Sequence, residues 1–416
     1  MDCFIIEGPS KVSGEVEVSG SKNSSLAILF ATLLTNEKCV LDNVPQLVDI
    51  KTTYEILSYI GKNCFFGFKR FDVEERSKIV MEAPYDLVRK MRASVLVAGP
   101  LLARFKYAKF SMPGGCAIGV RPIDIHLDGF KKLGAEIDIK EGYVILKAKK
   151  LKPATIHLKF PSVGATENLM MAASLIEGKT IIKNAAKEPE VEDLACVLNK
   201  MGAKVFGVGS DTVIVYGRKK LKGFEHTVIP DRIEAQTFMI LGAMCGRVKV
   251  KNVIVNHCKD LITKLKKSGA KVITGDNFVE VIKPTRIKAV NVETCPYPGF
   301  PTDIQAQWMA YMCLCNSKAK ITESIFENRF MHVAELNRMG ANISIKGNTA
   351  IVRGVKNLIG ATVMASDLRA GAGLILAAIS AFGRSKIRRI YHIDRGYEKI
   401  EEKLLELGVK IKRIEE

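Results

Sequence analysis

An amphipathic helical pattern that ends at a glycine recurs along the whole chain of 416 residues. The glycines that end the six copies are Gly61, Gly134, Gly202, Gly269, Gly340 and Gly408. Successive copies are separated by 73, 68, 67, 71 and 68 residues, which is longer than the repeats of solenoid proteins. Glycine can end a helix in the left-handed conformation without a steric penalty. The pattern therefore predicts six copies of one folding unit.

Each copy also contains a helical segment that is apolar around its whole circumference and rich in small residues. These six segments are 24–34, 91–104, 167–176, 234–245, 303–315 and 368–382. A helix without a polar face has to be buried on every side. Strand-like segments follow the glycines. We therefore expect an α/β fold of βαβαββ units, with these helices inside and the strands and amphipathic helices outside.

The two ends of the chain indicate how the units are grouped. Residues 1–20 contain two strand-like segments, whereas the sixth copy ends after one strand at 409–414. We expect the N-terminal strands to complete the sixth unit. Three units then form a domain of residues 21–229, and three form a second domain of residues 1–20 plus 230–416. A cleft between two such domains is a natural ligand site.

Composition and the N-terminal sequence limit the class of protein. The chain is 47% hydrophobic and 26% charged, as is usual for a globular protein. The N-terminus lacks the basic and apolar segments of a signal peptide, so we expect a cytoplasmic protein. No apolar stretch approaches the roughly 20 residues of a membrane span, and we expect no membrane partner. The ten cysteines include no CxxC pair, which argues against a zinc site and a disulfide framework.

The formal net charge of +19 fits a nucleic-acid partner, an anionic membrane surface or strongly anionic small substrates. The lysine clusters are short and lack interleaved aromatic residues, so we expect no nucleic acid. A basic repeat scaffold that binds nucleic acid is the alternative, and its affinity would fall steeply with salt.

Several residues stand where anion binding or proton transfer is plausible. The segment 112–126 interrupts the second unit with glycines, Cys116 and Arg121, which suits a loop that closes on an anion. The thiol could be a nucleophile or a general acid, and its spacing does not decide between them. Further candidates lie near the starts of the inward helices or at the next junction, where phosphate and carboxylate groups bind. They are Lys22, Asn23, Asp303, Arg329, Arg369 and Arg395.

Nine motifs, taken together in their order, resemble the UDP-N-acetylglucosamine 1-carboxyvinyltransferase family of enolpyruvyl transferases. The motifs are Lys22-Asn23, 114–126, 162–166, 188–190, 230–234, 300–303, 326–332, 367–370 and 391–397. The resemblance covers essentially the whole chain. It implies a fold of two inside-out α/β barrel domains with three units each, in agreement with the repeat count.

The resemblance also implies a reaction, the first committed step of peptidoglycan synthesis. Enolpyruvyl passes from phosphoenolpyruvate to the 3′-hydroxyl of UDP-N-acetylglucosamine, and phosphate leaves through a tetrahedral ketal. No metal or cofactor is implied. By this likeness Cys116 protonates the vinyl carbon and is alkylated by fosfomycin, and Asp303 is the base near the sugar hydroxyl. The residues implied to hold phosphoenolpyruvate are Lys22, Arg121 and Arg395 for its phosphate and Arg329 and Arg369 for its carboxylate.

The contacts implied for the nucleotide sugar are spread over both domains. They are Asn23, Arg92, Arg121, Pro122, Ile123, Asp124, Ile125, Ser162, Val163, Gly164, Asp303 and Ile325. Some family members have a lysine two residues before the matching serine, where this chain has Phe160. This difference argues against a direct diphosphate contact from that stretch. Ser21 and Ser24 stand where alanine is frequent, which should leave Lys22 in place.

The expected architecture also resembles that of a second enzyme class, the 3-phosphoshikimate 1-carboxyvinyltransferases, which use the same donor. The Cys116 loop and the segment 300–303 favour the nucleotide-sugar branch. We expect the enzyme to be a monomer.

Overall fold

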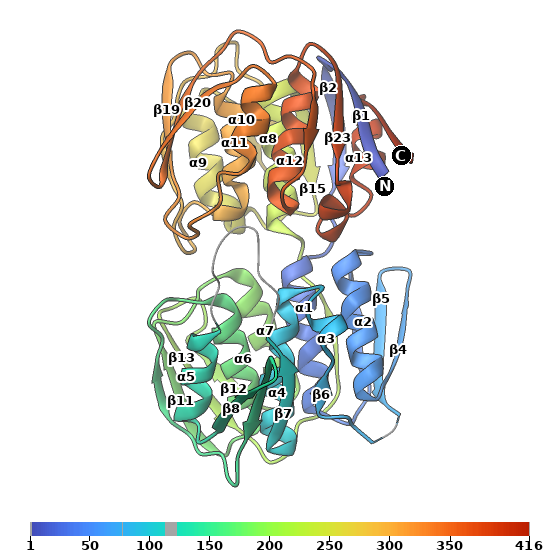
Figure 1. The fold of residues 1–416 in the computed structure, drawn as a ribbon, viewed down its shortest axis with the longest axis vertical. Coiled ribbons are helices and arrows are strands. Elements are labelled where there is room, and N and C mark those ends of the chain that lie inside the picture. The colour runs from blue at the N-terminus through green and yellow to red at the C-terminus, as the bar shows by residue number, and fades with distance from the viewer. Residues whose placement is uncertain (1, 77, 113–122, 416) are drawn as a thin grey trace. The chain divides into compact units, whose positions relative to one another are not determined.

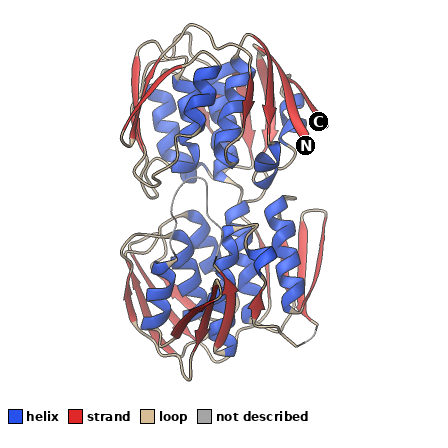
Figure 2. Cartoon of the chain, in the orientation of Figure 1, coloured by secondary structure: helices blue, strands red, loops and turns tan. Residues whose placement is uncertain are grey.

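The computed structural model describes residues 2–76, 78–112 and 123–415. This part of the chain separates into two compact units. Domain A comprises residues 20–229 and domain B residues 2–19 and 230–415, in both cases without the undescribed positions. Within each domain, the helices lie inside and the strands line the outside (Figures 1 and 2).

The described part of domain A contains three four-stranded sheets. Their strands are β3 (Cys39–Asp42), β4 (Lys62–Gly67), β5 (Arg70–Glu75), β6 (Glu82–Ala83), β7 (Tyr107–Ser111), β8 (Glu136–Lys140), β9 (Tyr143–Lys147), β10 (Thr155–His157), β11 (Gly178–Lys183), β12 (Lys204–Phe206), β13 (Thr212–Gly217) and β14 (Phe224–Thr227). The strand orders are β14-β3-β5-β4, β6-β7-β9-β8 and β10-β11-β13-β12. In each sheet the first pair is parallel and the other pairs are antiparallel.

Three helices of domain A face inward. They are α1 (Lys22–Ala31), which continues as η1 (Thr32–Leu34), α4 (Ala98–Phe105), which follows η2 (Arg92–Val97), and α6 (Val163–Ala173). Every residue of α1 except Asn23 is buried, as a helix without a polar face requires. The predicted helix 91–104 starts as a 3-10 helix. The α-helix begins at Ala98, which places Pro100 in its first turn, where an N–H group has no partner within the helix. The remaining helices are α2 (Val48–Ile60), α3 (Tyr85–Val88), α5 (Asp124–Lys132) and α7 (Pro189–Lys200).

Domain B repeats this arrangement, again with three four-stranded sheets among its described residues. Its strands are β1 (Asp2–Gly8), β2 (Val12–Glu17), β15 (Gly246–Lys251), β16 (Lys271–Thr274), β17 (Phe278–Ile282), β18 (Val292–Glu293), β19 (Lys318–Thr322), β20 (Asn342–Lys346), β21 (Thr349–Arg353), β22 (Thr362–Met364), β23 (Gly383–Arg388) and β24 (Lys410–Glu415). The strand orders are β22-β23-β1-β24, β16-β17-β15-β2 and β18-β19-β21-β20.

The inward helices of domain B pack against one another. They are α8 (Arg232–Cys245), α10 (Gln305–Met312) and α12 (Leu368–Ser380). The other helices are α9 (Lys259–Lys267), α11 (His332–Arg338), α13 (Ile400–Glu406), η3 (Val255–Cys258), η4 (Thr302–Ile304) and η5 (Ile390–Arg395). All six repeat glycines have positive φ angles, from 85° at Gly340 to 116° at Gly61. The predicted α/β fold class is confirmed, and the left-handed helix ends explain why glycine recurs.

The N-terminal strands differ from our expectation in one respect. β1 completes the sixth unit, because it lies between β23 and β24. β2 does not, because it pairs in parallel with β15 and belongs to the unit of α8. A parallel strand is needed before each inward helix, and the chain enters α8 directly from domain A. The N-terminus supplies this parallel strand as β2, which pairs with β15. In the same way, β14 supplies the parallel partner of β3 in domain A.

Along the described parts of the chain, no helix combines the length and the apolar character that crossing a membrane requires.

A buried amide joins three elements of domain A. Asn168 on α6 accepts a hydrogen bond from Gly99 N at 2.7 Å and donates one to Val95 O at 2.9 Å. Its Nδ2 also lies 3.1 Å from Nδ1 of His126 on α5. Because an amide nitrogen only donates, Nδ1 accepts and the neutral imidazole carries its proton on Nε2. Burial, with a further contribution from Arg92, lowers the pKa of His126 to about 3.

This histidine should make the stability of the protein depend on pH. The unfolded chain binds a proton to His126 below pH about 6.5, whereas the folded chain stays neutral there down to about 3. Stability should therefore fall as the pH drops from about 6.5 toward 3. His126→Gln, measured by urea unfolding across that range, should lessen the slope by up to about 1.4 kcal/mol per pH unit. Equal slopes for the two proteins would contradict this assignment.

Candidate active site

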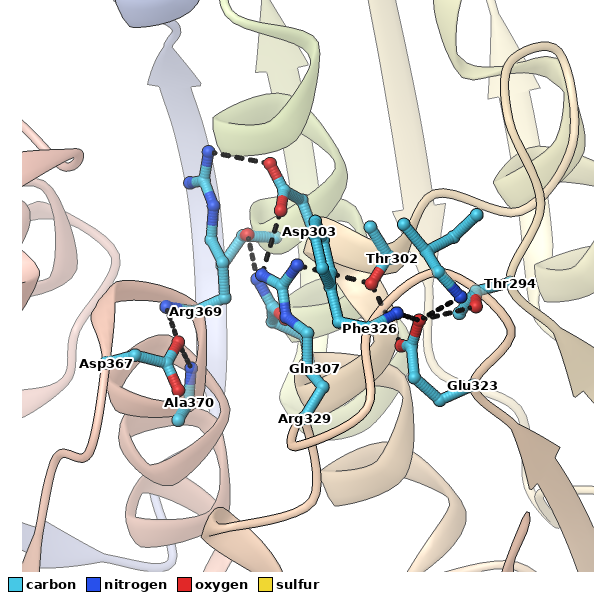
Figure 3. A network of polar contacts seen from close by, with 12 residues as sticks. Thr294, Thr302, Asp303, Gln307, Glu323, Phe326, Arg329, Asp367, Arg369 and Ala370 are labelled. Atoms are coloured by element: carbon cyan, nitrogen blue, oxygen red, sulfur yellow. Dashed lines mark hydrogen bonds and ion pairs between the residues drawn. The ribbon is translucent and has the colours of Figure 1, made fainter. Parts of the chain in front are cut away.

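One carboxylate of domain B is held between two buried arginines. Asp303 lies in η4, directly before the inward helix α10. Its Oδ1 accepts a hydrogen bond from Nη2 of Arg329 at 2.8 Å, and Nη2 of Arg369 lies 3.4 Å from Oδ2 (Figure 3). Arg329 and Arg369 are both buried. The structure therefore brings three of the sequence-predicted site residues into one cluster.

The two guanidinium groups control the charge of Asp303. Burial by itself would raise the pKa of this carboxyl, but Arg369 and Arg329 together hold it well below the usual range for aspartate. The side chain is also 28% exposed, so water can reach it. Asp303 is therefore ionised at neutral pH and can accept a proton, although it is a weak base while both arginines bind it.

The backbone at the start of α12 orients Arg369. The side chain of Asp367 caps this helix by accepting hydrogen bonds from the N atoms of Arg369 at 2.9 Å and Ala370 at 3.1 Å. The guanidinium carbon of Arg369 lies 5.5 Å from the centre of the Tyr397 ring. The helix cap and the aromatic ring thus direct a buried cation toward Asp303.

Two further candidates, Arg395 and Ile325, belong to domain B. Arg395 is the last residue of η5 and is partly buried. Burial lowers the pKa of His392, and the charge of Arg395 adds to that effect. Ile325 is partly buried, and its N donates to Oε1 of Glu323 at 3.0 Å.

In domain A the candidate phosphate ligand Lys22 is the first residue of α1. Its side chain is only 10% exposed, and Nζ lies 2.8 Å from Oδ2 of Asp49 on α2. Ser21 caps the helix by accepting from Ser24 N at 3.3 Å. Asn23 follows and is partly buried. A cation thus stands at the positive end of a helix, where an anion would be stabilised.

Apart from Asn23, the described nucleotide-sugar candidates of domain A lie at the starts of η2, α5 and α6. Gly164, in the first turn of α6, comes so close that an added Cβ would lie 3.4 Å from Cε1 of His126. Ser162 caps α6 and accepts from Ala165 N at 3.4 Å. Arg92 begins η2, and its charge contributes to the low pKa of His126. The other members of this group are Val163 on α6 and Ile123, Asp124 and Ile125 at the start of α5.

Three candidates, Cys116, Arg121 and Pro122, lie outside the residues that the structure describes.

Sequence reasoning missed several polar residues that support this site. They are Asp49, His126, Asn168, Thr302 and Glu323. His126 and Thr302 stand inside the motifs 114–126 and 300–303 and could have been singled out there. Asp49 and Glu323 carry no local signal, because their importance rests on contacts with residues far away in the sequence.

Residues 6–404 of the chain match the model of a family described as EPSP synthase (3-phosphoshikimate 1-carboxyvinyltransferase). Among curated relatives, UDP-N-acetylglucosamine 1-carboxyvinyltransferase 1 of Caldanaerobacter subterraneus subsp. tengcongensis is 53% identical over 411 residues, which cover 99% of both chains. UDP-N-acetylglucosamine 1-carboxyvinyltransferase of Endomicrobium trichonymphae is 53% identical over 416 residues, covering 100% of both chains.

Solved structures support the fold. The enolpyruvyl transferase NikO from Streptomyces tendae matches with a TM-score of 0.90 at 24% identity and covers 99% of this chain and 98% of its own. EPSP synthase from Acinetobacter baumannii matches with a TM-score of 0.77 at 18% identity over 100% of both chains. The predicted architecture of inside-out α/β barrels is confirmed. With these relatives matched over its full length, the chain belongs to the EPSP synthase family of carboxyvinyltransferases and, within it, to the UDP-N-acetylglucosamine 1-carboxyvinyltransferases.

Proposed function

We propose that the chain transfers the enolpyruvyl group of phosphoenolpyruvate to the 3′-hydroxyl of UDP-N-acetylglucosamine and releases phosphate. The observation that carries this proposal is the 53% identity, over the full length, to enzymes named UDP-N-acetylglucosamine 1-carboxyvinyltransferase. The carboxylate between two arginines in domain B supports it, because the reaction needs a proton acceptor beside anion-binding groups. We place the reaction in the cytoplasm, as the first committed step of peptidoglycan synthesis, and assign it to a monomer.

The donor, phosphoenolpyruvate, is a polyanion with two acid groups. We assign each group to a different set of the candidate cations. Arg329 and Arg369 bind the carboxylate of phosphoenolpyruvate. Lys22, Arg121 and Arg395 bind its phosphate. An anion on Arg329 and Arg369 would offset the charges that now keep the pKa of Asp303 low. Binding of the donor therefore makes Asp303 a stronger base.

The reaction adds and then eliminates. The 3′-oxygen of the sugar attacks C2 of phosphoenolpyruvate and gives its proton to Asp303, while Cys116 donates a proton to C3. The product is a tetrahedral ketal that still carries the phosphate. In the second step the thiolate left on Cys116 takes a proton back from C3, the C–O bond breaks so that phosphate leaves, and the double bond between C2 and C3 forms again.

The acceptor needs groups from both domains. Those assigned to it are Asn23, Arg92, Arg121, Pro122, Ile123, Asp124, Ile125, Ser162, Val163 and Gly164 from domain A and Asp303 and Ile325 from domain B. The proposal thus requires that one pair of substrates engage residues of both domains.

Phosphate release tests the proposed function directly. The wild-type protein should release phosphate from phosphoenolpyruvate only when UDP-N-acetylglucosamine is present, and Cys116→Ala should abolish the release. Release with shikimate 3-phosphate as the acceptor would instead support the alternative enzyme class. Tight binding of the nucleotide sugar without any release would contradict the proposed activity.

Asp303→Asn should remove the base and leave the size of the side chain unchanged. We expect kcat to fall by about 10²-fold or more, because a positioned base contributes roughly that much. Asp276→Asn, in an exposed loop of the same domain, serves as the matched control and should retain normal turnover. Circular dichroism verifies folding. Full activity of a folded Asp303→Asn protein would rule out the assigned role.

Fosfomycin should alkylate Cys116. The thiolate sulfur opens the epoxide, so the intact protein gains the mass of one inhibitor molecule. The described part of the chain also has exposed thiols at Cys196 and Cys295, and mass alone therefore does not locate the adduct. Cys116→Asp retains both of these thiols and should show no gain in mass. A gain that persists in this variant would assign the reaction to another cysteine.

A further inference from the structure

Glu323 is a buried carboxylate to which the proposed mechanism gives no role. It follows β19 and is 3% exposed. Its Oε1 accepts hydrogen bonds from Oγ1 of Thr294 at 2.8 Å, from N of Ile325 at 3.0 Å and from N of Phe326 at 3.2 Å. Its Oε2 accepts from Oγ1 of Thr302 at 2.9 Å. One side chain thus ties three separate segments together (Figure 3).

The contact with Thr302 fixes the direction of a hydrogen-bond chain. Oγ1 of Thr302 also lies 3.2 Å from Nη1 of Arg329. A guanidinium only donates and a carboxylate only accepts. The single hydroxyl proton of Thr302 must therefore point to Glu323, which leaves an oxygen lone pair facing Arg329. The other nitrogen of that arginine, Nη2, donates to Asp303 at 2.8 Å.

Glu323 also acts on Arg329 through the backbone. By binding the N atoms of Ile325 and Phe326, it holds the start of the segment that leads to this arginine. The guanidinium carbon of Arg329 lies 5.2 Å from the centre of the Phe326 ring. The carboxylate of Glu323 therefore orients two neighbours of Arg329, which are the hydroxyl of Thr302 and the ring of Phe326.

We propose that Glu323 is a positioning residue for the transfer reaction, which acts through Thr302 to hold Arg329 in register with Asp303. The inference rests on the proposed function, because Arg329 and Asp303 matter for turnover only if that site performs the reaction. Glu323 itself touches no substrate. Through Glu323, the position of Arg329 depends on the direction in which the hydroxyl proton of Thr302 points.

The experiment is a double-mutant cycle on kcat. Glu323→Gln keeps the shape but places a donor group beside Thr302 or beside the backbone N atoms, and should lower kcat about 10- to 100-fold. Thr302→Val, which removes the hydroxyl, should cause a similar loss, and Thr302→Ser should restore most of the activity. In the Thr302→Val background, Glu323→Gln should lower kcat by less than a further factor of about three. The hydrogen-bond chain from Glu323 to Arg329 is already broken in that variant.

Glu293→Gln is the matched control. This exposed glutamate accepts from Oγ of Ser324 at 2.9 Å in the same segment, so the change removes the same charge without touching Thr302. It should leave kcat within about twofold of the wild type, as a surface substitution usually does.

Two results would overturn the inference. One is a Glu323→Gln protein with unchanged kcat. The other is an equal fold-loss in the wild-type and Thr302→Val backgrounds, since a merely structural role gives additive effects. If Glu323→Gln does not fold, the comparison of Thr302→Val with Thr302→Ser decides, and equal activities reject the proposal. A wild-type protein without phosphate release would instead reject the proposed function itself.

Discussion

The inward helices of both domains are buried around their circumference, and several of the candidate ligands stand at their N-terminal ends. The first four N–H groups of a helix have no partner within it, and they give that end a partial positive charge. Side chains of Ser21, Ser162 and Asp367 satisfy some of these groups at α1, α6 and α12. The candidate ligands Lys22 and Asp303 stand at the same ends. Within each domain, the position of these candidates thus follows from the packing of the helices.

Cations at these N-terminal ends are unfavourable until an anion arrives. A lysine or arginine there faces the positive end of a helix dipole. The protein offsets this cost with carboxylates, because Asp49 binds Lys22 and Asp303 binds Arg369. At the opposite ends in domain A, Arg104 donates to the carbonyl of Leu33, where a cation is favourable by itself. A substrate anion would take over the role that the two aspartates now fill.

The parts of this structure that local sequence determines were predictable. Gly340 and the other repeat glycines mark the units because the left-handed helix end requires them, and the apolar segments mark the interior. Strand pairings between segments that lie far apart in the sequence were not predictable. β2 was assigned to the wrong unit because its partner β15 lies more than 200 residues away. Glu323 and His126 look unremarkable in sequence, since their roles come from the residues that surround them in the fold. Positions near the helix starts indicated Lys22, Asp303 and the arginines as candidates, and the family resemblance supplied the roles proposed for them.

The pairing of Asp303 with two arginines ties the strength of the base to the occupancy of the site. With both guanidiniums bound to it, the carboxylate has a pKa well below the usual range for aspartate and is a weak base. In the proposed reaction, a donor carboxylate on Arg329 and Arg369 would compete for the same positive charge and raise the basicity of Asp303. If the proposed roles hold, deprotonation of the acceptor follows binding of the donor. A network that held Arg329 loosely would break this coupling, because the arginine could bind the donor without releasing the base.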